Sequence, residues 1–278
     1  MSNESGAPPR ARDVLAATWA RGLVGVAALL VLAEVLGRSG AINPSVLPLA
    51  STVLARAVGL AGNPRFLGDL AATIGAWAAG LAITVAVAVP SGLVLGSVPG
   101  VRTAAHAVVE FLRPIPAVAL IPLAALILGP GLRMNVTLIV YAAIWPVLFN
   151  TIYGVGDVDP VAKETLRAFG FGRLDVVRRV SLPAAAPFIF TGIQVASSIA
   201  IILNIGTGVV TGRIEGNGIG AFIADANASG GNTALVLAAA LWAGVLGLAL
   251  NGLLVWSGRR MLPWHRAYLG EQSLGKMR

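Results

Sequence analysis

The chain has 278 residues, of which 56% are hydrophobic and only 12% charged, and its net charge is +8. Ordinary soluble domains contain about 25% charged residues, so this composition argues against a soluble enzyme and for a protein that lies in a lipid bilayer. The absence of cysteine excludes disulfides, thiolate nucleophiles and cysteine-based metal sites. The two histidines, His106 and His265, cannot hold a metal ion by themselves.

Charge-free runs of about 18 residues or more are long enough to cross the hydrocarbon core of a bilayer as helices. Five runs in this chain meet that length, and a weaker run near the N-terminus carries Glu34 close to its far end. We therefore predict an all-α, polytopic membrane protein. Its six transmembrane helices are expected near residues 20–37, 70–98, 113–130, 135–155, 184–210 and 234–257.

The distribution of Lys and Arg sets the expected orientation, because cytoplasmic loops of membrane proteins are enriched in both residues. With the N-terminus inside, inner positions such as Arg102 and Arg113 outnumber the outer ones by three to one. We predict cytoplasmic tails at residues 1–19 and 261–278 around a six-span transmembrane domain at 20–260. No nucleic-acid partner is expected, because the basic excess follows the topology and not one soluble face.

Two outer segments differ from plain loops. Residues 43–63 carry an apolar and polar pattern typical of a helix that lies on the membrane surface. A glycine-rich segment, Gly216–Gly231, contains a short helical stretch at Ile219–Ala226. These segments either gate the outer mouth or simply connect spans, and the sequence leaves both interpretations open.

The inner loop between the fourth and fifth spans, residues 156–183, is the most informative part of the chain. Asp159 is a favourable N-cap and Pro160 suits the first helical position, so a helix should begin there. Gly170 and Gly172 should end it, and a second short helix is expected over Arg173–Ser181. We expect Leu182 and Pro183 to stop that second helix and open the fifth span.

This loop combines exposed apolar side chains with arginines. Phe169, Phe171 and Leu174 stand among Arg167 and Arg173. Aromatic residues surrounded by Arg are enriched at protein interfaces, which favours a loop that docks into a partner's cleft. An amphipathic loop packed on the chain's own inner surface is the alternative.

The spacing of Glu164, Gly170, Val180, Leu182 and Pro183 resembles the Glu-Ala-Ala-x3-Gly-x9-Ile-x-Leu-Pro signature of type I ABC importer permeases. The chain departs from that signature at Thr165, Leu166 and, conservatively, Val180. The segment Leu112–Pro122 and the pair Gly218 and Gly220 resemble the branch that includes nitrate, sulfonate, taurine and bicarbonate permeases. The resemblance extends from about residue 40 to 265, and it departs at Thr211, where many relatives have an acidic residue.

The resemblance implies a permease subunit of an ATP-driven importer in a bacterial inner membrane, surrounded by membrane lipid. Two permease copies, expected to form a homodimer, would pair with a cytoplasmic ABC ATPase dimer. A periplasmic or lipid-anchored binding protein would deliver a small nutrient such as a sulfonate, nitrate or bicarbonate-like solute. The implied ATPase-coupling residues are Glu164, Arg167, Phe169, Gly170, Phe171, Arg173, Leu174, Leu182 and Pro183.

The sequence contains no nucleotide-binding loop of its own. A Walker loop requires a lysine after Gly-x4-Gly, and neither Lys163 nor Lys276 lies in such a pattern. We therefore expect no catalytic residue and no cofactor in this chain, with ATP and Mg²⁺ held by the partner ATPase. The alternative function is an ion-gradient-driven secondary transporter of a small polar solute. Such transporters usually carry ionisable residues deep in the membrane, whereas here Glu34 and Glu110 lie close to span ends and the middle of each expected span is free of charge.

A polar stripe on the fifth span is the candidate translocation path. At about 100° per residue, its members fall within roughly 140° of one helix face. The stripe consists of Gln194, Ser197, Ser198, Asn204 and Thr211, to which the fourth span adds Tyr141, Trp145 and Asn150. Packing between helices is the alternative role, because small polar residues are common at membrane helix contacts. Gly92 and Gly96 likewise allow close helix approach, either within the chain or in a dimer.

Overall fold

The computed structural model describes residues 11–40, 43, 46–98, 100, 103, 109–212, 218–230 and 232–261. For residues 11–19 and 23 it describes the backbone alone. All regular elements in these ranges are helical, which confirms the all-α prediction. They are α1 (Ala11–Arg38), α2 (Ala50–Leu60), α3 (Pro64–Ser97), the 3-10 turn η1 (Ala117–Leu120), α5 (Ile121–Leu128), α6 (Leu132–Gly156), α7 (Pro160–Ala168), α8 (Arg173–Val176), the π-helical turn η2 (Val177–Ser181), α9 (Leu182–Thr211), α10 (Ile219–Ala228) and α11 (Thr233–Met261).

Within the described residues, five helical stretches are long and apolar enough to cross a membrane. They are Ala20–Arg38, Pro64–Ser97, Leu132–Gly156, Arg173–Thr211 and Thr233–Met261, and they correspond to five of the expected spans. The helix of the first span begins at Ala11, so it extends into the segment expected to be an N-terminal tail.

The expected span at 113–130 is wrong as one continuous helix. It consists of the four-residue turn η1 followed by the eight-residue helix α5. Pro114 and Pro116 have no N–H to donate to a helix, so the regular helix starts only after them. Gly129, with φ +70°, then ends α5. Together η1 and α5 would span only about 18 Å at 1.5 Å per residue, too short for the hydrocarbon core.

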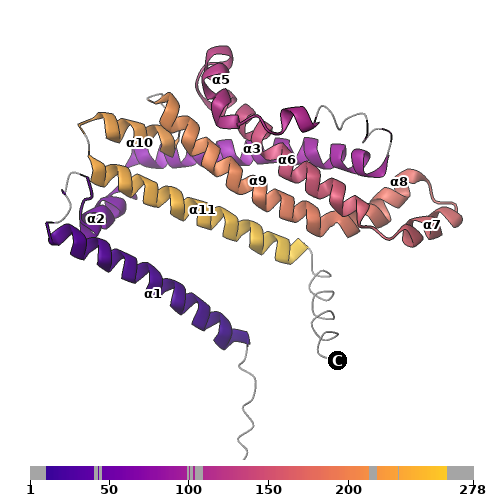
Figure 1. Cartoon of the computed structure of the whole chain (residues 1–278), viewed down its shortest axis with the longest axis horizontal. Coiled ribbons are helices and arrows are strands. Elements are labelled where there is room, and N and C mark those ends of the chain that lie inside the picture. The colour runs from indigo at the N-terminus through magenta and orange to yellow at the C-terminus, as the bar shows by residue number, and fades with distance from the viewer. Residues whose placement is uncertain are drawn as a thin grey trace, which may run out of the picture.

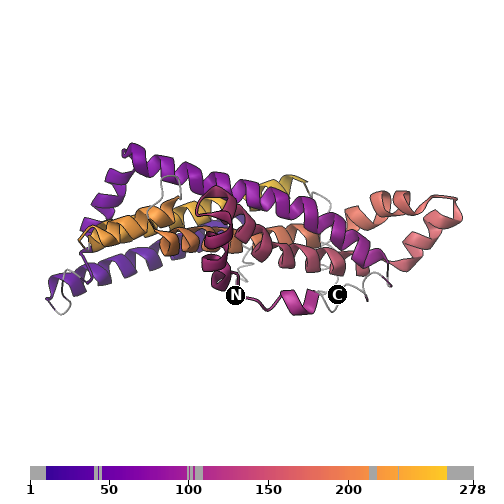
Figure 2. The same cartoon turned by 90° about the horizontal axis from the view of Figure 1, so that it is seen from above.

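The central layer of the fold is made by α3, α6 and α9, which pack along most of their lengths, as Figures 1 and 2 show. Its core is built from small or branched side chains that lose all contact with solvent, including Ile139 and Ala143 of α6 and Ala196 of α9. Helix α11 covers one side of this layer and packs against α2. The first span, α1, contacts α2 and diverges from α11 in Figure 1, so its apolar side chains remain exposed.

The glycine pair of α3 packs inside the chain. A Cβ at Gly92 would lie 2.6 Å from Cβ of Thr151, and a Cβ at Gly96 would lie 2.9 Å from Cβ of Val155, both on α6. The interpretation of this pair as an internal packing site is thereby confirmed, and α3 and α6 approach closely because these two positions carry no side chain.

Replacing Gly92 by alanine is therefore expected to lower stability by about 1–3 kcal/mol, because the added methyl group has no room. The matched control is Gly75→Ala on the same helix, where an added Cβ meets nothing within 4 Å. The stability of the Gly75→Ala control should rise slightly, because alanine has a higher helix propensity than glycine. Thermal unfolding of the purified protein in detergent measures both, and equal melting temperatures would contradict the packing argument.

Candidate functional site

The inner loop begins as the sequence predicts. The side chain of Asp159 accepts a hydrogen bond from the backbone N–H of Val161 at 2.9 Å, and Pro160 occupies the first helical position of α7. The helix ends in a glycine-dependent cap. The N–H of Phe171 donates to the carbonyl of Leu166 at 3.1 Å, and the N–H of Gly170 donates to that of Arg167 at 2.9 Å. This pattern requires φ of +83° at Gly170, a conformation that glycine adopts without strain.

The second helix of the loop does not stop at Leu182 and Pro183, so that part of the prediction is wrong. Helix α8 continues through the π-helical turn η2 into α9, giving one helical run of 39 residues from Arg173 to Thr211. Pro183 directly follows the π-helical turn, so it stands within this run and not at its start. The wider turn at Val177–Ser181 therefore lets the helix continue past a proline.

The predicted coupling residues all lie on the surface of this elbow, defined here as residues 156–183, which projects beyond the ends of α6 and α9 in Figures 1 and 2. Phe169 is 78% exposed and Leu174 is 69% exposed, so they do not pack on the chain's own inner surface. The Arg179 guanidinium lies 5.2 Å from the ring centre of Phe171. Val176, only 3% exposed, is the buried residue of α8. The result is an apolar and basic surface with few internal contacts.

Lys163 ties α7 to the end of α6. Its ammonium group donates a hydrogen bond to the carbonyl of Val155 at 2.9 Å. Burial of the ammonium group, and secondarily the positive charge of Arg167, lower the pKa of Lys163 below its usual value. This contact fixes the angle at which the elbow leaves the bundle.

The polar stripe of α9 divides between two environments. Ser197 accepts a hydrogen bond from the indole N–H of Trp77 at 3.0 Å, and the amide of Asn204 donates to the carbonyl of Thr73 at 2.9 Å. Both side chains are buried and join α9 to α3. Ser198 is exposed, Gln194 and Thr211 are half-buried, and the amide of Asn150 donates to the carbonyl of Pro146 at 2.8 Å. A path-lining role for these residues stays a prediction.

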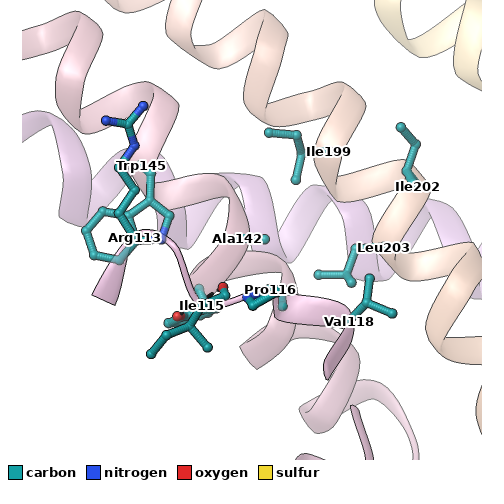
Figure 3. Close-up of a pocket in the computed structure, with 11 residues that line it drawn as sticks. Arg113, Ile115, Pro116, Val118, Ala142, Trp145, Ile199, Ile202 and Leu203 are labelled. Carbon is teal, nitrogen blue, oxygen red and sulfur yellow. Dashed lines mark hydrogen bonds between the residues drawn. The ribbon is translucent and has the colours of Figure 1, made fainter. Parts of the chain in front are cut away.

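Tyr141 and Trp145 lie together in a pocket of about 350 Å³, shown in Figure 3. Their rings meet edge to face with centres 6.2 Å apart, and the Tyr141 hydroxyl donates to the carbonyl of Leu112 at 2.8 Å. The indole N–H of Trp145 is buried and has no hydrogen-bond acceptor. The pocket is lined by Arg113, Ile115, Pro116, Ala117, Val118, Tyr141, Ala142, Trp145, Ile199, Ile202 and Leu203.

Arg113 lines this pocket, although the sequence argument counted it only among the inner basic residues and not in the candidate path. Its guanidinium lies 4.7 Å from the ring centre of Phe149 on α6. Arg113 therefore lies beside α6 and does not extend past the inner end of that helix. The available signal was the Leu112–Pro116 motif, whose two prolines turn the chain back against α6. Only the tertiary packing shows that this turn carries Arg113 to Tyr141 and Trp145.

Helix α10 confirms the short helix expected near Ile219–Ala226 and is held to the outer part of α3 by polar contacts. The hydroxyl of Thr73 accepts a hydrogen bond from the N–H of Ile219 at 2.9 Å and donates to the carbonyl of Asp69 at 3.0 Å. Arg65 forms an ion pair with Asp225. The outer glycine-rich segment is thus fixed to the bundle at two points.

Comparison with known proteins gives the same fold and identifies the family. Residues 88–263 match the family described as binding-protein-dependent transport system inner membrane component. The chain is 32% identical over 177 residues to the nitrate import permease protein of Leptolyngbya laminosa, covering 62% of each chain. It is 27% identical over 254 residues to the putative aliphatic sulfonates transport permease protein of Bacillus subtilis, covering 91% of this chain and 90% of that one.

A third relative is the bicarbonate transport system permease protein of Synechococcus elongatus, with 28% identity and 66% of each chain covered. Among solved structures, a chain of the MetNI methionine ABC transporter in inward-facing conformations aligns with a TM-score of 0.56 and 20% identity. That alignment covers 72% of this chain and 93% of that one, and it supports the fold. The family match extends from the end of α3 through the elbow to α11, and the chain therefore belongs to the inner membrane components of binding-protein-dependent transport systems.

Proposed function

We propose that this chain is the transmembrane permease subunit of an ATP-driven ABC importer and forms the translocation path for a small nutrient. The observation that carries the proposal is the exposed elbow at the inner end of the bundle. Its exposed apolar side chains are Phe169, at the end of α7, and Leu174, which lies on a helical run that continues to the outer end of α9. A partner that binds this surface can therefore move a membrane-spanning helix.

The proposed partners follow from family membership and from the shape of the elbow. A cytoplasmic ABC ATPase dimer would receive two elbows, one from each of two permease copies, and it would hold ATP and Mg²⁺. A periplasmic or lipid-anchored binding protein would deliver the solute at the outer side. There, α10 and the ion pair between Arg65 and Asp225 form part of the surface.

The proposed substrate class is a small anion. The relatives' names specify nitrate, aliphatic sulfonates and bicarbonate, and all three carry a negative charge spread over oxygen atoms. We place the path along the α6 and α9 faces that carry Tyr141, Trp145, Gln194 and Ser198. Ser197 and Asn204 would support this path from behind, because they bind α3.

Reconstitution into vesicles tests this function. Vesicles that contain the permease and its cognate ATPase, with ATP inside and binding protein outside, should accumulate labelled nitrate, taurine or bicarbonate. Omission of the ATPase, or replacement of ATP by a non-hydrolysable analogue, should reduce uptake to the level of empty vesicles. Uptake driven by a proton or sodium gradient without the ATPase would instead support a secondary transporter and overturn the proposal.

A further inference from the structure

The pocket in Figure 3 is lined by one charged side chain, that of Arg113. Arg113 contacts the ring of Phe149, which stands seven residues before the inner end of α6 at Gly156. At 1.5 Å per residue, this position is about 10 Å inside the helix end. The exposed side chain of Arg113 therefore lies just inside the inner end of a membrane-spanning helix, and an ionisable residue in such a place points to a functional site.

The polar side chains of the pocket differ in what they offer a ligand. The guanidinium of Arg113 has only donors, and the indole of Trp145 has a single N–H that lacks an acceptor. The Tyr141 hydroxyl uses its proton on the carbonyl of Leu112. None of the residues that line the pocket is acidic, so no carboxylate in the wall competes for the guanidinium. A wall of this kind favours a ligand that accepts hydrogen bonds and carries negative charge.

The remaining lining restricts the ligand to a small one. Ile199, Ile202 and Leu203 of α9 form the apolar side opposite Arg113 and Pro116, in a volume of about 350 Å³. Ile202 is 72% exposed, so this side of the pocket is open. A small anion such as nitrate or a short sulfonate fits this pocket, because the guanidinium of Arg113 can bind its charge. The aromatic rings and the apolar side chains of α9 can contact the rest of it.

We propose that the pocket formed by Arg113, Tyr141 and Trp145 is an anion-binding site on the translocation path, with Arg113 as its charge-selecting residue. This inference rests on the proposed transport function and assigns its substrate selectivity to one guanidinium. In the present conformation the Trp145 N–H is covered. A shift of the Leu112–Pro116 turn, which the Tyr141 hydroxyl ties to α6, would uncover it as a second donor.

Transport selectivity provides the first test. In the reconstituted system, Arg113→Gln should reduce ATP-driven nitrate uptake about tenfold or more, the usual effect of losing a hydrogen bond to a charged group. Arg113→Lys should retain most uptake because it keeps the charge. Urea, which is planar and similar in size to nitrate but neutral, is the control solute, and Arg113→Gln should not change its leakage rate. Equal nitrate uptake by the wild type and Arg113→Gln would overturn the assignment.

A second test does not depend on transport, so it separates failure of this site from failure of the proposed function. The chain has no cysteine, and Ile202→Cys therefore introduces a single thiol in the pocket. A sulfonate-bearing methanethiosulfonate should modify this thiol faster than a trimethylammonium-bearing one, and nitrate should slow the reaction. The preference should fall about tenfold in the double variant with Arg113→Gln. Ser229→Cys, in the exposed outer loop, is the control and should show no dependence on Arg113.

Equal reactivity of Ile202→Cys toward both reagents, with no protection by nitrate, would refute the anion site even in an active importer. A strong preference for the sulfonate reagent that depends on Arg113 would support it even if the vesicles showed no ATP-driven uptake. If Arg113→Gln fails to accumulate in the membrane, two other results decide whether the pocket binds anions. They are the nitrate uptake of Arg113→Lys relative to the wild type, and the protection of Ile202→Cys by nitrate.

Discussion

The double substitution Phe169→Ala and Leu174→Ala is expected to weaken binding of the cognate ATPase about a hundredfold or more, because large anchor residues at an interface commonly contribute 2 kcal/mol or more each. Both side chains project from the elbow into solvent. Their removal therefore leaves the folded permease almost unchanged while taking the apolar anchors from the docking surface. Co-purification of the ATPase in detergent, followed by a binding titration, measures the effect.

The matched control removes the same residue types elsewhere. Phe111 and Leu126 are as exposed as Phe169 and Leu174 but lie outside the elbow. The double variant Phe111→Ala and Leu126→Ala should bind the ATPase as the wild type does. Undiminished binding by the elbow variant, or equal losses in both variants, would contradict the docking role of the elbow.

The second large effect concerns the outer helix α10. Thr73→Val should destabilise the attachment of α10 by about 1–3 kcal/mol, because it leaves the buried N–H of Ile219 without an acceptor. Valine has nearly the same shape as threonine, so the change removes the hydrogen bonds and little else. Backbone amides in residues 219–228 should exchange with solvent about tenfold faster or more, since 1.4 kcal/mol corresponds to a factor of ten. Hydrogen exchange read by mass spectrometry measures this opening.

Thr84→Val provides a stringent control for this effect. Thr84 lies on the same helix and is fully buried, but its hydroxyl has no hydrogen-bond partner. Its replacement by valine should therefore be neutral or stabilising. Equal exchange of α10 in the two variants would show that Thr73 does not hold the outer helix.

Local chemistry allowed much of the fold to be predicted from the sequence. Asp159 and Pro160 start α7, and Gly170 ends it, because a capping carboxylate, a fixed φ and a positive φ act within a few residues. The expected span at 113–130 failed because a charge-free run does not register the backbone donors lost at Pro114 and Pro116. At Leu182 and Pro183 we expected a helix to stop, but the helix continues there because a π-helical turn accommodates the proline.

The candidate site was predictable only in part, because it depends on which helix faces which. The stripe on α9 is contiguous on a helical wheel, yet α3 covers Ser197 and Asn204 and leaves Ser198 exposed. The Lys and Arg count placed Arg113 on the inner side but did not connect it with Tyr141 and Trp145. The contact of Arg113 with Phe149 depends on the chain reversal at Pro114 and Pro116, a tertiary feature that no periodicity contains.

The continuous helical run from Arg173 to Thr211 has a mechanical consequence. At about 1.5 Å per residue it forms a rod of roughly 58 Å. Gly192 stands at its midpoint, where an added Cβ would lie only 2.8 Å from the carbonyl oxygen of Pro146 on α6. A rod held close to its neighbour at its midpoint has two arms of equal length on either side of that contact. A tilt about this contact would move the elbow and the Thr211 end in opposite directions.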